Sequence, residues 1–212
     1  MKGTFITIEG PDGAGKTSVI QALLPKLEKA LKQRIVATRE PGGSRIAEEI
    51  RELILNPENT EMDVRTEALL YAAGRRQHLV EKIIPALEAG EIVICDRFVD
   101  SSLAYQGVAR GIGVEQVAAI NQFATDGLTP DMTLYLDVEA DVGLARINQN
   151  KVNRQFDRLD QEDLSFHQQV RSAYLDLLKQ NPERMLLIDA SQELEQVVSD
   201  SYNKILEKLA YE

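Results

Sequence analysis

The stretch Thr4-Phe5-Ile6-Thr7-Ile8-Glu9-Gly10-Pro11-Asp12-Gly13-Ala14-Gly15-Lys16-Thr17 decides the fold. Its first six residues are mostly apolar or β-branched, which predicts a buried strand that ends before Gly10. The next eight match the pattern G-x-x-x-x-G-K-[S/T], and helical spacing of apolar residues begins after them. A strand, this turn and a helix in that order predict a phosphate-binding loop.

The glycines of such a loop let several backbone N–H groups point at one phosphate, and the following helix adds the positive end of its dipole. We expect Lys16 to reach the β- and γ-phosphates of a nucleoside triphosphate and Thr17 to offer its hydroxyl to Mg²⁺. The motif does not identify what receives the phosphoryl group.

Outward from the loop, strand and helix patterns alternate along the chain. Strands are predicted at 35–38, 92–95, 132–136 and 185–188, and helices at 17–32, 46–55, 66–89 with a break near Pro85, 114–124, 142–147, 166–178 and 194–209. The alternation predicts an α/β protein of the P-loop NTPase type, a three-layer fold with a five-stranded parallel sheet and helices on both faces. We expect one domain over 1–212, with a polar, mobile lid at about 148–163.

The composition narrows the class of protein. The chain has 212 residues and is 43% hydrophobic and 27% charged, as in globular proteins. Its net charge of −10 disfavours non-specific binding to nucleic acid or an anionic membrane. The single cysteine, Cys95, and two histidines give no disulfide framework or zinc cluster. No signal peptide or membrane-length apolar run is present, so we expect a cytoplasmic protein with no membrane or nucleic-acid partner.

Charged residues follow two predicted strands and suggest a second phosphate site. Arg39-Glu40-Pro41 comes after the second strand, and Asp96-Arg97-Phe98 comes directly after the third. The carboxyl ends of parallel strands meet at one edge, where ligands bind, so the arginines could hold a phosphate and Asp96 could support Mg²⁺. Turn charges and surface ion pairs are the alternatives.

Two helical faces carry groups that suit a base or a sugar. Tyr71 and Arg75 are four residues apart, and Ser102, Tyr105 and Gln106 line one side of a helical turn. A buried core tyrosine and a helix start rich in capping residues are the alternatives.

The polar stretch 148–163 contains Arg154 and Arg158. Because the phosphate loop has no arginine, either could swing over the phosphates and neutralise charge in the transition state. A surface loop is the alternative reading of this composition.

Over essentially its whole length, the chain resembles the bacterial thymidylate kinases. Four signatures in order carry the resemblance: Glu9-Gly10-Pro11-Asp12-Gly13-Ala14-Gly15-Lys16-Thr17, Arg39-Glu40-Pro41-Gly42-Gly43, Tyr71-Ala72-Ala73-Gly74-Arg75-Arg76-Gln77-His78, and Asp96-Arg97-Phe98-Val99-Asp100-Ser101-Ser102-Leu103-Ala104-Tyr105-Gln106-Gly107. It implies transfer of phosphate from Mg²⁺-bound ATP to dTMP, giving dTDP for dTTP synthesis, by a homodimer.

The resemblance also implies site residues. The implied ATP-binding set is Gly10, Pro11, Asp12, Gly13, Ala14, Gly15, Lys16, Thr17, Ser18, Ala190 and Ser191, the last two bordering the adenine. The implied dTMP-binding set is Arg39, Glu40, Pro41, Arg51, Tyr71, Arg75, Arg97, Ser102, Tyr105 and Gln106. The implied catalytic residues are Asp12, Lys16, Arg97, Arg154 and Arg158, and the implied metal ligands are Thr17 and Asp96.

Within the dTMP set, the resemblance places Arg39 and Arg97 on the phosphate and Glu40 near the phosphates and metal. It implies that Tyr71 stacks on thymine and that Tyr105 lies against the deoxyribose and disfavours a 2′-hydroxyl. The base edge would be bonded by Arg75, Ser102 and Gln106. Bacterial members more usually carry Glu at position 12, Phe at 71 and Asp or Ser at 74.

Two other functions fit parts of the sequence. One is another small-molecule kinase on the same scaffold that acts on a different nucleotide, which the block from Asp96 to Gly107 disfavours. The other is a nucleotide-dependent switch or assembly ATPase without an acceptor, which would lack the second arginine cluster of Arg39 and Arg97.

Overall fold

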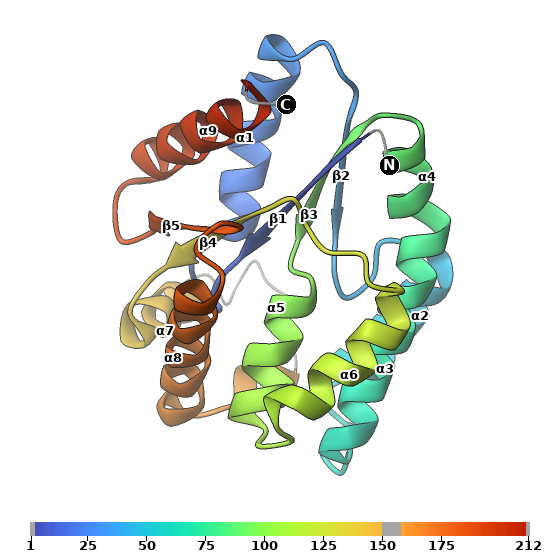
Figure 1. Ribbon diagram of the computed structural model, residues 1–212. Coiled ribbons are helices and arrows are strands. Elements are labelled where there is room, and N and C mark those ends of the chain that lie inside the picture. The colour runs from blue at the N-terminus through green and yellow to red at the C-terminus, as the bar shows by residue number, and fades with distance from the viewer. Residues whose placement is uncertain (1–2, 150–157, 211–212) are drawn as a thin grey trace.

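The computed structural model describes residues 3–149 and 158–210. Its strands are β1 (Thr4–Glu9), β2 (Ile35–Arg39), β3 (Ile92–Asp96), β4 (Met132–Asp137) and β5 (Met185–Asp189). They form one parallel sheet in the order β2-β3-β1-β4-β5, with helices on both sides (Figure 1). The predicted α/β fold with a five-stranded parallel sheet is confirmed.

Most helices match the predicted ranges. The helices are α1 (Lys16–Ala30), α2 (Arg45–Leu55), α3 (Val64–His78), α4 (Ile84–Glu88), α5 (Val99–Ser102), α6 (Val114–Thr125), α7 (Ala140–Gln149), α8 (Leu164–Gln180) and α9 (Leu194–Ala210). No helix was predicted at α5, however, and the predicted range 66–89 corresponds to both α3 and α4. Two π-helical segments, Leu79–Ile83 and Leu103–Ala109, and a 3₁₀ turn, Arg158–Gln161, lie between them. Among the described residues, no helix is long and apolar enough to cross a membrane.

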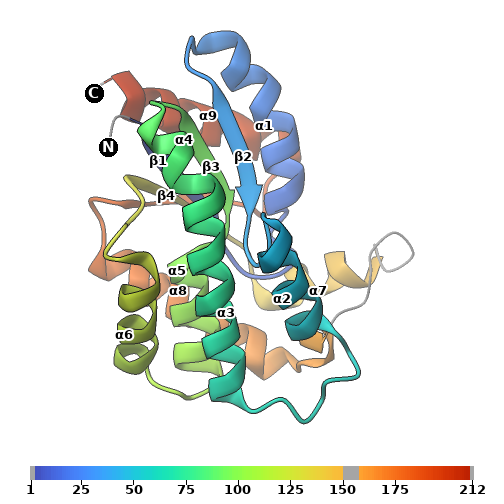
Figure 2. The same ribbon diagram turned by 90° about the vertical axis from the view of Figure 1, so that its right-hand side faces the viewer.

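Both faces of the sheet are covered by helices, which explains why all six residues of β1 are buried. Ile6 and Ile8 pack with residues of α1 and α9, the two helices that lie side by side in Figure 1. Phe5 points the opposite way and packs with Leu79 and Leu87 of the α3–α4 region, which Figure 2 shows across the sheet. The buried strand therefore supplies side chains to two separate cores.

The region around Pro85 differs from the predicted break. The chain continues from α3 through the π-helical segment Leu79–Ile83 into α4, where Pro85 occupies the first turn. Proline has no N–H to bond the preceding turn, and a locally wider turn accommodates that loss without ending the helix.

Every strand ends in a charged residue at the same edge of the sheet. The residues are Glu9, Arg39, Asp96, Asp137 and Asp189. The register pairs Arg39 with Asp96 and Asp137 with Asp189. This is the edge at which open parallel sheets bind ligands.

The phosphate loop rests on α7 through two glycines. A Cβ on Gly13, whose φ is 78°, would come within 2.1 Å of the Gly143 carbonyl oxygen. A Cβ on Gly143 would lie 2.5 Å from the Asp12 carbonyl oxygen. Only residues without side chains allow this backbone approach, so α7 helps to fix the loop's position.

We predict that Gly143→Ala lowers the melting temperature and weakens ATP binding, because its methyl group must displace the loop. Gly74→Ala is the matched control: it is also helical, but its Cβ would meet nothing closer than 3.4 Å, a side-chain atom of Ile50. The control should keep or raise the melting temperature, since alanine favours helix by up to about 1 kcal/mol over glycine. Equal melting curves and ATP affinities for both variants would contradict this packing argument.

Candidate active site

A cavity of about 860 Å³ opens at the carboxyl edge of the sheet. Its lining brings together most of the predicted site residues: Asp12, Gly13, Ala14, Gly15, Lys16, Thr17, Ser18, Arg39, Glu40, Pro41, Arg51, Tyr71, Arg75, Asp96, Arg97, Ser102, Tyr105, Gln106, Ala190 and Ser191. The volume suits small-molecule ligands. Five segments of the chain, at 12–18, 39–51, 71–75, 96–106 and 190–191, thus form one site.

Lys16 is folded against the phosphate loop. Its Nζ donates to the carbonyl oxygens of Gly10 at 3.0 Å and Pro11 at 2.9 Å. Burial, together with the nearby Arg97 charge, lowers the pKa of Lys16 to about 8. A bound polyphosphate would favour the charged form and draw the ammonium from these carbonyls.

Thr17 and Asp96 form a second feature beside the loop. The Thr17 hydroxyl donates to Asp96 Oδ2 at 3.2 Å. Asp96 Oδ1 is buried and has no hydrogen-bond partner within 3–149 and 158–210. A buried carboxylate oxygen without a partner is costly, and oxygen ligands of this kind suit Mg²⁺. The predicted metal-binding pair therefore fits a cation.

Arg97 connects the end of β3 to the phosphate loop. Its φ of 67° is left-handed, which turns its side chain back toward the loop. Nη1 donates to the Gly10 carbonyl at 2.9 Å, and Nη2 pairs with Asp12 at 2.7 Å. The guanidinium also lies 5.0 Å from the centre of the Tyr105 ring.

Asp12 is held by two partners, Arg97 and the Tyr105 hydroxyl, which donates to it at 2.8 Å. Burial alone would raise the pKa of Asp12, but the charges of Arg97 and Lys16 outweigh burial and hold it below its usual range. Burial raises the pKa of Tyr105, so its hydroxyl stays a donor. The aspartate at position 12, which is shorter than the glutamate usual in bacterial members, thus holds Arg97 and Tyr105 in place.

A buried carboxylate beneath Arg97 holds the turn that presents it. Glu9 is 0% exposed, and its oxygens accept from the Phe98 N–H at 2.7 Å, Ser101 Oγ at 2.6 Å and the Tyr174 hydroxyl at 2.7 Å. Burial, reinforced by Asp100, raises the pKa of Glu9. Ser101 bonds Arg97 in turn, so Glu9 supports the arginine without touching the cavity.

Arg39, the second arginine of the predicted acceptor site, is held by a residue outside the cavity. Arg39 forms a two-pronged pair with Glu48, at 2.7 and 3.1 Å. The hydrogen bond from Arg39 lowers the pKa of Glu48, and Glu48 raises the pKa of Arg39. Arg51 adds a bond to the Pro41 carbonyl at 2.9 Å, which ties α2 to the same loop.

Arg75 is only 2% exposed yet lines the cavity. Its Nε donates to Glu40 at 2.6 Å, Nη1 donates to Ser102 at 3.1 Å and to Asn121, and Nη2 donates to the Phe98 carbonyl at 3.0 Å. Four of its five N–H groups are thus engaged by described residues, which leaves one on Nη2 for a ligand.

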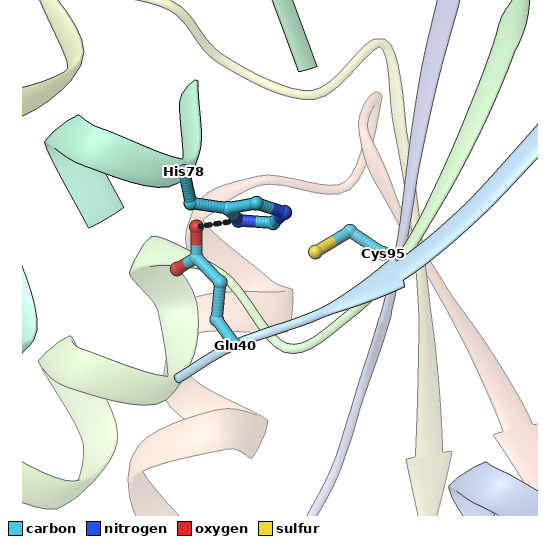
Figure 3. A group of neighbouring side chains, drawn as sticks. All are labelled: Glu40, His78 and Cys95. Carbon is cyan, nitrogen blue, oxygen red and sulfur yellow. Dashed lines mark hydrogen bonds and ion pairs between the residues drawn. The ribbon is translucent and has the colours of Figure 1, made fainter. Parts of the chain in front are cut away.

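Glu40 lines the cavity, and its carboxylate is bonded by protein side chains. Its carboxylate bonds Arg75 and, at 3.0 Å, His78 Nδ1. Figure 3 shows Glu40, His78 and Cys95 converging, as metal ligands can. Each of these potential metal-ligating groups already has a hydrogen-bond partner within the protein, however. Cys95 Sγ donates to the Arg97 carbonyl, and His78 Nε2 bonds Thr38. The cluster therefore serves to connect β2, β3 and α3.

Comparison with known proteins identifies the family. The thymidylate kinase profile matches residues 8–201. The thymidylate kinase of Latilactobacillus sakei is 65% identical over 199 residues, which cover 94% of this chain and 92% of that protein. The thymidylate kinase of Enterococcus faecalis is 61% identical over 208 residues, 98% of each chain. The chain belongs to the thymidylate kinase family.

The fold agrees with this assignment. The crystal structure of thymidylate kinase from Ehrlichia chaffeensis matches with a TM-score of 0.80 at 32% identity, covering 97% of this chain and 100% of that one. Membership of the thymidylate kinase family confirms the predicted enzyme class, an ATP-dependent kinase acting on dTMP. The roles of individual residues, the metal and the homodimer stay predictions.

The predicted lid arginines have different outcomes. Arg154 lies outside the described residues. Arg158 is 8% exposed, donates to the Ile54 carbonyl at 3.0 Å and pairs with Glu67, and it does not line the cavity. A buried carboxylate binds a guanidinium strongly, and this partner holds Arg158 away from its expected place over the phosphates.

Several residues that shape the site were not predicted from the sequence. Glu67, Asn121, Arg146 and Tyr174 each bond or adjoin a predicted site residue; Arg146, for example, donates to the Ala190 carbonyl at 2.9 Å beside the expected adenine site. They lie far along the chain from their partners, in ordinary helical patterns. Of these supporting residues and Glu9, which was not predicted either, only Glu9 lies within one of the four signatures, where its position indicates only the end of a strand.

We predict that ATP affinity falls as the pH rises through 8. Free Lys16 loses its proton above this pKa, whereas bound phosphates keep it charged, so binding above pH 8 must take up a proton. Calorimetry with a non-hydrolysable ATP analogue should show about tenfold weaker binding at pH 9 than at pH 7. Lys16→Arg, which stays charged, is the control and should show no such slope. A dissociation constant of wild-type protein that is flat over this range would contradict the assignment.

Proposed function

We propose that this chain transfers the γ-phosphoryl group of Mg²⁺-bound ATP to the phosphate of dTMP, giving dTDP. The observation that carries the proposal is the arrangement of cations around one cavity. Lys16 and the phosphate loop lie on one side, and Arg39 and Arg97 come from neighbouring strand ends. A donor and an acceptor phosphate can thus be held together, which is the main requirement of this reaction.

The chemistry needs little from the protein beyond position and charge. The phosphate of dTMP is already largely dianionic at neutral pH, so no general base is required. Lys16 would bind the β- and γ-phosphates, and Arg97, kept in place by Asp12, would orient the acceptor oxygen. Exclusion of water from the site, and cations on both sides of the transferring phosphoryl group, then favour in-line transfer.

Mg²⁺ would be held by the Thr17 hydroxyl and Asp96. The unpartnered Asp96 Oδ1 supports this proposal. The ion would neutralise charge on the phosphates of ATP.

Another group of cavity residues suits a pyrimidine base. Tyr71 and Arg75 come from α3, and Gln106 comes from the π-helical segment that follows α5. Tyr71 would stack on thymine, while Arg75 would donate its one remaining N–H on Nη2 to a base carbonyl. Tyr105, fixed by Asp12 and Arg97, would lie against the deoxyribose and exclude a 2′-hydroxyl.

The adenine of ATP would lie near Ala190 and Ser191, next to Arg146. We also propose that Arg154, in the predicted lid at about 148–163, supplies charge to the transferring phosphoryl. Arg158, the lid arginine among the described residues, does not line the cavity.

A homodimer is part of the proposal. Figure 2 shows α2, α3 and α6 as one layer of the molecule, and α3 contacts both of the others. Phe123 of α6 is 89% exposed and Leu69 of α3 is 55% exposed, which is a high exposure for large apolar residues. An interface with a second copy would remove them from water.

An ADP-release assay with Mg²⁺ and ATP tests the proposed function. Parallel reactions contain dTMP, dUMP, dCMP, dGMP or dAMP. We expect fast turnover with dTMP and little with dCMP or the purine nucleotides. Turnover with another acceptor alone would overturn the proposed base site, and ADP release independent of every acceptor would indicate an ATPase instead.

A further inference from the structure

Glu67 is a buried carboxylate at the start of α3, 1% exposed. Its Oε1 accepts from Gln106 Nε2 at 2.8 Å and from Arg110 Nε at 3.4 Å, and its Oε2 accepts from Arg158 Nη2. Three segments from distant parts of the chain therefore meet at one side chain that does not itself line the cavity.

These contacts decide which end of the Gln106 amide faces the cavity. A carboxylate paired with two guanidiniums offers only acceptors, so it must bond the NH₂ end of the amide. The carbonyl end, Oε1, is then directed elsewhere. Gln106 lines the cavity, and among the described residues nothing bonds its Oε1. The side chain is therefore fixed as an acceptor for a ligand.

We propose that Glu67 is a positioning residue that sets base selectivity by fixing the polarity of the Gln106 amide. The inference rests on the proposed function. Thymine and uracil present a ring N3–H donor beside the O4 acceptor, whereas cytosine presents an N3 acceptor beside an amino donor. Gln106 Oε1 as acceptor and the remaining Arg75 N–H as donor match the first pattern and oppose the second.

Without Glu67 the amide would lose this restriction. Its two ends have nearly the same shape, so a free glutamine can rotate and present its NH₂ group to the N3 of cytosine. Glu67 therefore acts against the wrong base as well as for the right one.

The test compares wild-type enzyme with Glu67→Gln, using dTMP, dUMP and dCMP. The glutamine has nearly the same size and can bond either end of the Gln106 amide. We expect the ratio of kcat/KM for dTMP over dCMP to fall roughly tenfold, the factor that one hydrogen bond typically provides. The ratio for dTMP over dUMP should stay unchanged, because both bases share the N3–H edge. A merely structural role would lower all three activities together and leave both ratios unchanged.

Glu162→Gln is the matched control. Glu162 pairs with the same Arg110 at 2.6 Å but does not bond Gln106, so its loss should leave both ratios as in the wild type. In a Gln106→Ala background, Glu67→Gln should have no further effect on selectivity. If Glu67→Gln does not fold, Glu67→Asp replaces it in the test. The aspartate keeps the charge, but its shorter side chain holds Gln106 less firmly, so the ratio of kcat/KM for dTMP over dCMP should fall.

The outcomes distinguish a failure of the proposed role of Glu67 from a failure of the proposed function. Wild-type enzyme that prefers dTMP, with Glu67 variants of unchanged selectivity, would overturn the role of Glu67 alone. Wild-type enzyme that does not phosphorylate dTMP would overturn the proposed function first.

Discussion

The ion pair between Arg97 and Asp12 joins the two halves of the site. Arg97 directly follows β3, and Asp12 lies in the phosphate loop after β1. A residue with a φ of 67° is strained unless its surroundings hold it, and here Glu9 binds the next backbone N–H while Ser101 binds the guanidinium. In the proposed reaction, the spacing between the ATP phosphates and the acceptor phosphate would depend on how firmly this arginine is held.

Three buried carboxylates share a common task. Glu9, Glu40 and Glu67 are each 5% exposed or less, and each holds a cavity residue in place: Arg97 through its turn, Arg75, and Gln106. Burying a carboxylate is costly, and replacing a buried ion pair with apolar residues often leaves stability unchanged. Their contribution is thus to orientation, since a reaction governed by position loses rate when a binding group shifts by an ångström.

Much of the fold and part of the site could be predicted from the sequence. The strand, glycine-rich turn and helix at 4–17 are a local pattern, and the alternation of strand and helix patterns along the chain predicted the parallel sheet. Local patterns cannot supply partners that lie far away in the chain: Asn121 reaches Arg75 across 46 residues, and Tyr174 reaches Glu9 across 165. The same limit explains Arg158, whose polar surroundings predicted a lid but whose guanidinium binds Glu67, 91 residues away. The partners of Glu40 were missed for the same reason, since Arg75 lies 35 residues away and His78 lies 38 residues away.

The most direct test of this account is the kinetics of Arg97→Lys. The lysine keeps the charge but loses the planar fork that bonds Asp12 and that, in the proposed function, would also bond the acceptor phosphate. The account predicts that kcat/KM for dTMP falls roughly 10–100-fold, the loss expected for charge-assisted hydrogen bonds, while the dissociation constant for ATP changes by no more than about twofold. Wild-type kinetics with dTMP, or an equal loss of ATP binding, would contradict it.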